Sequence, residues 1–194
     1  MPEEMMLINH DTTWEEVGSY DPATNKPPKP GGGSGGCVRN AFKNGTAKKV
    51  QLKDAFKLYK FNHGDQLTHE NSNEVSPWWS PYLAYEWDAG WEERKKLAAH
   101  LKVNIRELGR VTSAVKENWS SLSHVLVVEL KQGAYGYFGG FAQMCRIDEG
   151  AKSNRDPNIE AKGNTKNLPG GGTQFYIPNL TTGNVTLVSV ELLA

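Results

Sequence analysis

The chain lacks several features that would assign it to a particular class of protein. Its only two cysteines, Cys37 and Cys145, form no disulfide framework and show no metal-ligand spacing. Neither sign of charge is in excess, because 22 basic residues balance 22 acidic ones. Proteins that bind duplex nucleic acid usually carry a basic surplus, so general nucleic-acid binding is not expected.

Long apolar runs and common catalytic motifs are also missing. No segment approaches the roughly 20 apolar residues that cross a bilayer, and the N-terminus carries no basic and apolar signal segment. No P-loop, GxGxxG fingerprint or nucleophile elbow is present. His63 and His69 lie near Asp65 and Glu70, but neither helical spacing nor a CxxC accompanies them, so we expect no metal site.

The composition divides the chain into two regions. Residues 1–36 are acidic and end in a run of proline, glycine and serine, which is typical of a linker. Within them, Trp14 and the apolar residues near Met5 are able to dock as a small strand or turn. We expect residues 1–36 to be a leader and linker, and residues 37–194 to be a single domain.

Hydrophobic periodicity predicts an α+β fold with the helices grouped on one part of the sheet. Residues 50–58 fit neither period and suggest a short helix or turn, whereas 75–82 suggest a loop. In the second expected helix Asn104 and Glu107 resemble a capping box, and Arg106, Arg110 and Lys116 fit a solvated face. Helices are expected at 88–101 and 105–119, and strands at 58–62, 125–130, 132–142, 175–177 and 185–192.

Gln174 follows three consecutive glycines, Gly170 to Gly172, at the start of an expected strand. Glycines at such a point allow positive φ angles or the close approach of another chain segment or a ligand. A polar side chain where a loop becomes sheet is a common position for binding and catalytic groups. The stretch is either an ordinary glycine turn or the edge of a site.

Two adjacent tryptophans, Trp78 and Trp79, form a second unusual feature, because a Ser-Pro pair flanks them on each side. Neighbouring side chains of an extended segment point in opposite directions. One ring is therefore expected in the core and the other beside a surface groove, where it suits a nucleobase or a nicotinamide ring. The alternative is that both rings anchor a long loop.

Four short segments together resemble ADP-ribosyltransferase-type toxin domains, the C-terminal effectors of bacterial polymorphic and secreted toxin systems: 58–61, 76–80, 137–143 and 170–175. The resemblance covers roughly residues 58–192. It implies a split two-sheet α+β catalytic domain that grips NAD, with a mobile substrate-recognition loop at 146–168. A toxin of this type would be secreted or delivered into a target cell, whereas the chain would otherwise be cytoplasmic.

The resemblance also assigns roles to residues. Tyr59-Lys60 stands where the family has an aromatic residue and arginine, although His63-Gly64 is similar to the histidine motif of another branch. Gln174 occupies the late-strand position, and Ser76 or Ser80 resembles the serine of the second motif. The implied catalytic residues are Gln174, His63 and Lys60, and the implied NAD-binding residues are Tyr59, Ser76, Trp78, Trp79 and Ser80.

One departure from the family concerns charge. The family's late strand carries a glutamate motif, but Gln174 is followed by Phe175 and Tyr176. A carboxylate stabilises a ribosyl oxocarbenium ion by its charge, which a glutamine lacks. Glu129 or Glu160 would have to supply that charge, or the activity is lost or differs.

Three functions remain open at this stage. The first is an NAD-dependent ADP-ribosyltransferase or NAD glycohydrolase that acts as a bacterial toxin, with NAD as substrate, an unidentified acceptor, a possible cognate inhibitor protein and no membrane partner. The second is an RNA-cleaving toxin that uses His63, His69 or Lys60. The third is a non-catalytic interaction domain anchored by the two tryptophans.

Overall fold

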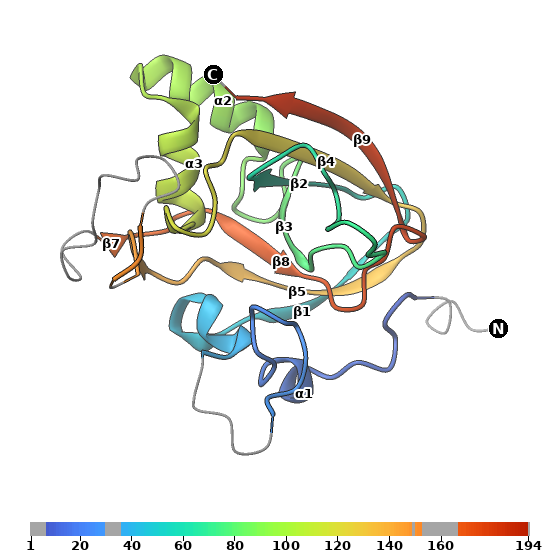
Figure 1. Ribbon diagram of the computed structural model, residues 1–194. Coiled ribbons are helices and arrows are strands. Elements are labelled where there is room, and N and C mark those ends of the chain that lie inside the picture. Colours follow the sequence, from blue (N-terminus) through green and yellow to red (C-terminus); the bar gives the residue numbers. More distant parts are fainter. Residues whose placement is uncertain (1–6, 30–35, 149, 153–166, 194) are drawn as a thin grey trace.

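The computed structural model describes residues 7–29, 36–148, 150–152 and 167–193 and confirms an α+β fold (Figure 1). The helices are α1 (Trp14–Val17), α2 (Trp91–Leu101) and α3 (Ile105–Ser113), with 3-10 turns η2 (Val38–Ala41) and η3 (Lys43–Gly45). The strands are β1 (Lys48–Leu52), β2 (Lys57–Asn62), β3 (Trp78–Pro81), β4 (His124–Leu130), β5 (Ala134–Gly140), β6 (Met144–Cys145), β7 (Asn167–Leu168), β8 (Thr173–Tyr176) and β9 (Val185–Leu192).

Seven of these strands form one antiparallel sheet in the order β1-β5-β8-β3-β2-β4-β9, and β6 pairs with β7 separately. The two halves of the large sheet meet at β3. This short strand pairs with β8 through Trp78 and Trp79 and with β2 through Ser80 and Pro81. Figure 1 shows the halves folded toward each other, with loops lying between them.

The two faces of the sheet bury different clusters. The concave face holds the largest cluster, which includes Leu58, Trp79 and Phe175. The opposite face carries two smaller clusters. One lies under α2 and α3 and contains Tyr59, and the other lies under α1 and η2 and contains Tyr176.

Three local predictions were wrong. The second long helix ends at Ser113 instead of residue 119, because Ala114 takes a left-handed conformation with φ of 49°. Arg110 is 2% exposed, not solvated, and its guanidinium donates hydrogen bonds to the carbonyl groups of Val115 and Ser120 beyond the helix end. Residues 48–52 and 78–81 form strands, which their irregular apolar spacing had concealed.

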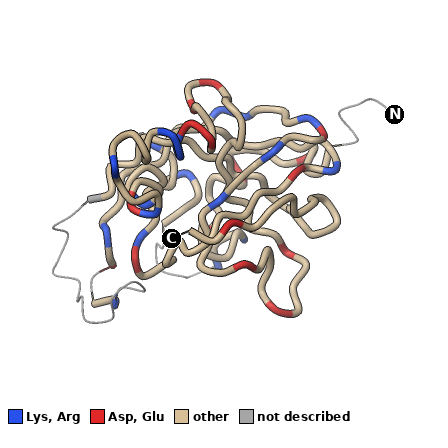
Figure 2. Tube along the Cα trace, turned by 90° about the horizontal axis from the view of Figure 1, so that it is seen from above, with Lys and Arg blue, Asp and Glu red and all other residues tan. Residues whose placement is uncertain are grey.

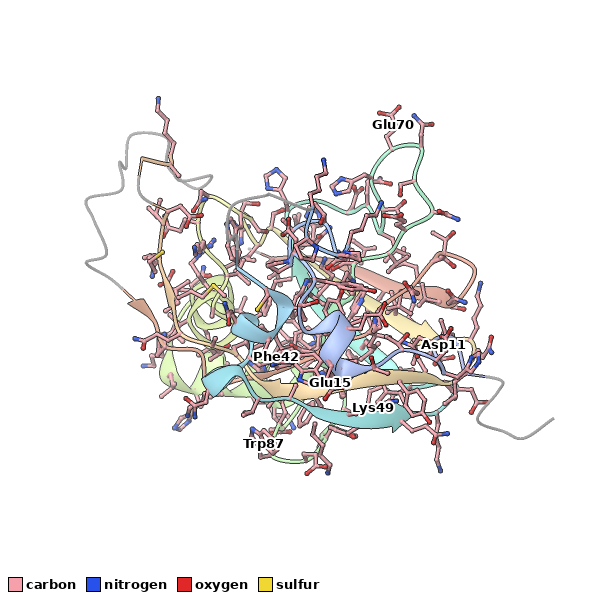
Figure 3. All side chains as sticks on the ribbon, turned by 90° about the horizontal axis from the view of Figure 1, so that it is seen from below. Asp11, Glu15, Phe42, Lys49, Glu70 and Trp87 are labelled. Atoms are coloured by element: carbon pink, nitrogen blue, oxygen red, sulfur yellow. The ribbon has the colours of Figure 1, made fainter. Side chains whose placement is uncertain are left out.

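The chain before Cys37 packs against the rest of the molecule over its described residues. Val17 is fully buried, and the Trp14 ring contacts the rings of Phe42 and Tyr137. Figure 3 shows Glu15, on α1, close to Phe42 on the same side of the sheet. The expected linker residues 30–35 lie outside the described residues.

Charges are distributed in small pairs. Figure 2 shows acidic and basic residues on both sides of the molecule. Lys48 pairs with Glu86 and Lys57 with Glu129, while Lys49 lies over the Tyr135 ring. Of the helices in the described part of the chain, none has the length and apolar character needed to traverse a bilayer.

Candidate functional site

The glycine segment before Gln174 is held in place by α3. Gly170 and Gly171 have φ angles of 75° and 112°, which favour glycine. The Gly170 N–H donates a hydrogen bond to the Val111 carbonyl (3.0 Å), and the Gly172 N–H donates to the Thr112 carbonyl (3.0 Å). The two conformational roles expected of these glycines, positive φ and close approach, therefore both occur.

The close approach is made by the guanidinium of Arg94. A Cβ at Gly172 would lie 2.4 Å from Arg94 Nη2. Arg94 donates hydrogen bonds to Asp88 Oδ2 (2.6 Å) and Thr112 Oγ1 (2.8 Å), so its side chain is fixed from two directions. α2, α3 and the glycine segment are thus joined at this one side chain.

Asp88 connects the same group to strand β8. Its Oδ2 also accepts hydrogen bonds from the Thr173 N–H (3.0 Å) and Thr173 Oγ1 (2.7 Å), and its Oδ1 accepts one from the Gly90 N–H (2.9 Å). The carboxylate is buried, and the Arg94 charge compensates its own. Asp88 therefore fixes the residue that immediately precedes Gln174.

Gln174 itself is 3% exposed. Its Nε2 donates a hydrogen bond to the Ala41 carbonyl (2.7 Å) at the end of η2. Its Oε1 accepts no hydrogen bond from any residue that the structure describes. The amide is thus held through its nitrogen, and its oxygen remains able to accept a hydrogen bond.

Three residues chosen from the sequence lie on the same face as Gln174. Directly opposed residues of antiparallel strands share a face, and so do residues two apart in one strand. Trp78 opposes Tyr176, which lies two residues after Gln174. Ser80 lies two residues after Trp78 and opposes Tyr59. The sheet therefore gathers Tyr59, Trp78 and Ser80 around Gln174.

Several polar atoms on this face are buried without a hydrogen-bond partner. They are the hydroxyl groups of Tyr59 and Tyr176 and the Nε of Arg94. Burial is the main cause that raises the pKa of Tyr59, so this hydroxyl stays protonated. An unmade hydrogen bond at a buried polar group costs about 1–3 kcal/mol, and three on one face are unusual.

The other predicted site residues do not join this face. Lys60 and Trp79 lie on the concave face, where Lys60 Nζ sits 5.7 Å from the centroid of the Trp79 ring. Burial lowers the pKa of Lys60 to about 8. The two tryptophans thus point in opposite directions, as the extended backbone predicted, with Trp79 in the core and Trp78 half-buried.

Ser76 and His63 have local partners. Ser76 organises the tryptophan pair, because its Oγ accepts a hydrogen bond from the Trp78 N–H (3.3 Å) and its carbonyl accepts one from Trp79 Nε1 (2.5 Å). His63 is exposed at the end of β2, with its Nδ1 2.9 Å from Ser121 Oγ. The catalytic role predicted for His63 stays a prediction.

Of the two glutamates considered as sources of charge, Glu129 pairs with Lys57 (3.8 Å), and Glu160 lies outside the described residues. Most of the expected mobile loop at 146–168 lies outside them as well. At its start Arg146 forms ion pairs with Glu107 and Glu117, both 2.6 Å long. These pairs attach the beginning of the segment to α3 and to the residues that follow it.

The sequence did not single out Arg94 or Asp88. Both fall within the expected helix at 88–101, which begins at Trp91 with Gly90 as its cap residue. In the sequence, Arg94 is distinguished only by its position one helical turn after Gly90, within a run of charged residues. That position does not separate Arg94 from its exposed neighbours.

The assembled face is suited to hydrogen bonding and aromatic stacking. It carries an amide oxygen, two buried tyrosine hydroxyls and a half-buried indole, while the Asp88 carboxylate and the Arg94 guanidinium neutralise each other. Among the described residues, no group of three or more His, Cys, Asp or Glu side chains is arranged to hold a metal ion.

No protein-family model matches the chain, and no curated protein matches its sequence. Two solved structures match at low identity. Rhs1-CT in complex with its cognate immunity protein RhsI1 matches at 16% identity and a TM-score of 0.44, over 76% of this chain and 82% of that chain. Tne2 in complex with Tni2 matches at 13% identity and a TM-score of 0.45, over 79% of this chain and 98% of that chain.

Proposed function

We propose that the chain consumes NAD, as an ADP-ribosyltransferase or an NAD glycohydrolase that acts as a bacterial toxin effector, and that the reaction takes place at Gln174. The observation that supports this best is the fixed amide of Gln174, whose Oε1 has no donor among the described residues, on a sheet face that also carries buried polar atoms without partners. The two hydroxyls of a ribose would supply the missing hydrogen bonds. A planar ring beside the ribose would stack on the half-buried indole.

The reaction breaks the bond between the nicotinamide nitrogen and C1′ of the ribose. Nicotinamide leaves with the bonding electrons, and C1′ takes up water or an acceptor nucleophile, which releases a proton. Gln174 Oε1 would accept a hydrogen bond from a ribose hydroxyl and hold the ring in place, a contribution of positioning. Ser80 and Tyr59 would flank the ribose, and Trp78 would contact a base.

Asp88 and Arg94 would act on this site indirectly. They hold Thr173, and thereby the backbone position of Gln174. Because the ion pair is neutral overall, we assign it a positioning role and not the stabilisation of the oxocarbenium ion. That stabilisation would have to come from dipoles on the face or from Glu160, which lies outside the described residues.

The direct test is nicotinamide release from NAD by the purified protein. We expect Gln174→Ala to lower the rate at least tenfold, because one oriented hydrogen bond in a buried site contributes about that much or more. Gln51→Ala, at an exposed glutamine of β1, is the matched control and should keep the wild-type rate. Absence of both NAD turnover and NAD binding in the wild-type protein would rule the function out.

The geometry gives the alternatives less support. RNA cleavage by Lys60 with His63 would need both groups together, but Lys60 Nζ lies at the Trp79 ring, whereas His63 Nδ1 lies beside Ser121 Oγ. An interface anchored by the paired tryptophans would need exposed rings, but Trp79 is 1% exposed. The acceptor and a cognate inhibitor protein remain parts of the proposed toxin function.

A further inference from the structure

Strand β9 leaves one of its edges unpaired. Among the residues that the structure describes, it is the last strand in the sheet order and pairs with β4 alone. Figure 1 shows it along the upper border of the molecule, with no other element on its outer side. An open edge presents backbone N–H and C=O groups that another strand can bind.

The two borders of the sheet differ in protection. β1, at the other border, carries the exposed lysines Lys48 and Lys49, and charge of this kind discourages pairing between edges. β9 has no lysine, arginine or proline. Its single charged residue, Glu191, already lies 3.9 Å from Lys95 of α2. Nothing in its sequence blocks a partner strand.

β9 also exposes an unusual amount of apolar surface. Val188, Val190 and Leu192 are 47%, 41% and 72% exposed, in a strand of eight residues. Val190 opposes the buried Leu126 of β4, so its side chain extends the largest core cluster at the border of the sheet. Exposed apolar residues that extend a core are typical of an interface.

We propose that β9 pairs antiparallel with β9 of a second copy of this chain, about a two-fold axis at Val190. This pairing sets Val190 opposite Val190, Ser189 opposite Glu191, and Val188 opposite Leu192. Apolar residues meet apolar ones, and each Glu191 faces a serine instead of another carboxylate. The strand is therefore complementary to itself, as a two-fold interface requires.

The irregularity in β9 selects this register. The pairing with β4 shifts between Val127 and Val128, so Ser189 and Glu191 share one face, whereas Leu187 lies on the other. An axis at Ser189 would set Glu191 opposite Leu187, whose side chain points to the opposite face. An axis at Val190 instead sets Ser189 opposite Glu191, whose side chains share a face.

The oligomeric state over the micromolar range, measured by sedimentation or light scattering, tests the pairing. We expect a dimer in the wild-type protein and a monomer in Val190→Lys, which places two lysines in contact at the axis. Thr186→Lys adds the same charge to an exposed position of the strand outside the paired segment, and it should remain dimeric. A monomeric wild type, or a Val190→Lys dimer, would overturn the pairing.

Disulfide cross-linking tests the register and does not depend on how the charged variant folds. Opposed Cα atoms in an antiparallel pair lie about 4.5–5.5 Å apart, within the disulfide range. In a Cys37→Ser, Cys145→Ser background, Val190→Cys should form a covalent dimer on oxidation and Thr186→Cys should not. Cross-linking of Thr186→Cys alone, or of neither variant, would contradict the axis at Val190.

Discussion

Burial of Lys60 disfavours the charged form of its side chain. Burial lowers its pKa from 10.5 to about 8, and its ammonium group faces the Trp79 ring. Between these two values the unfolded chain still binds the proton that the folded chain has released. The free energy of unfolding should therefore rise with pH across this window.

The rise attributable to Lys60 should be about 1–2 kcal/mol between pH 7 and 10, allowing for its partial exposure. Chemical denaturation at several pH values gives the unfolding free energy as a function of pH. This free energy should rise with pH in the wild type, and the rise should disappear in Lys60→Met. Lys53→Met, at an exposed lysine, should keep the wild-type slope. Equal slopes in all three proteins would show that Lys60 is solvated.

At the scale of elements, the glycine segment, α2 and α3 depend on one another through Arg94. Gly172→Ala would push a methyl group against a guanidinium that Asp88 and Thr112 hold fixed. We expect a loss of about 1–3 kcal/mol in unfolding free energy, as for other overpacked sites. Gly64→Ala, where a Cβ meets no atom within 4 Å, is the control in the same thermal unfolding assay.

If the segment acts as a support for Gln174, Gly172→Ala should also reduce NAD turnover at temperatures where the protein remains folded. A variant with full stability and full turnover would mean that Arg94 moves aside freely. Circular dichroism at the assay temperature separates loss of folding from displacement of Gln174.

Strands were predictable where the apolar pattern is clear. β4 is apolar over most of its seven residues, and β9 largely alternates apolar and polar residues over eight. The end of α3 was not predictable, because the apolar series continues to Trp119 while Ala114 leaves the helical conformation. The positive φ angles and the close approach at the glycines before Gln174 were predictable from the sequence. Asp88 and Arg94 were not, because their importance arises from contacts between segments 85 residues apart in sequence.

At the scale of the whole molecule, the question is whether the residues before Cys37 belong to the folding unit. Val17 is fully buried in a cluster with Val38, Phe42 and Tyr137. The N–H groups of Val38 and Arg39 donate hydrogen bonds to the carbonyls of Tyr20 and Gly18. These contacts join α1 to the η2 segment that holds Gln174, so we expect one cooperative unfolding transition.

Val17→Ala tests this expectation, because it removes two buried methyl groups and should lower the unfolding free energy by about 2–3 kcal/mol. Glu15→Ala changes an exposed residue of the same helix and should have little effect. If the N-terminal region only attaches to a separate domain, Val17→Ala will leave the main calorimetric transition in place. A lowered single transition would instead mean that α1 is part of the scaffold that orients Ala41 toward Gln174.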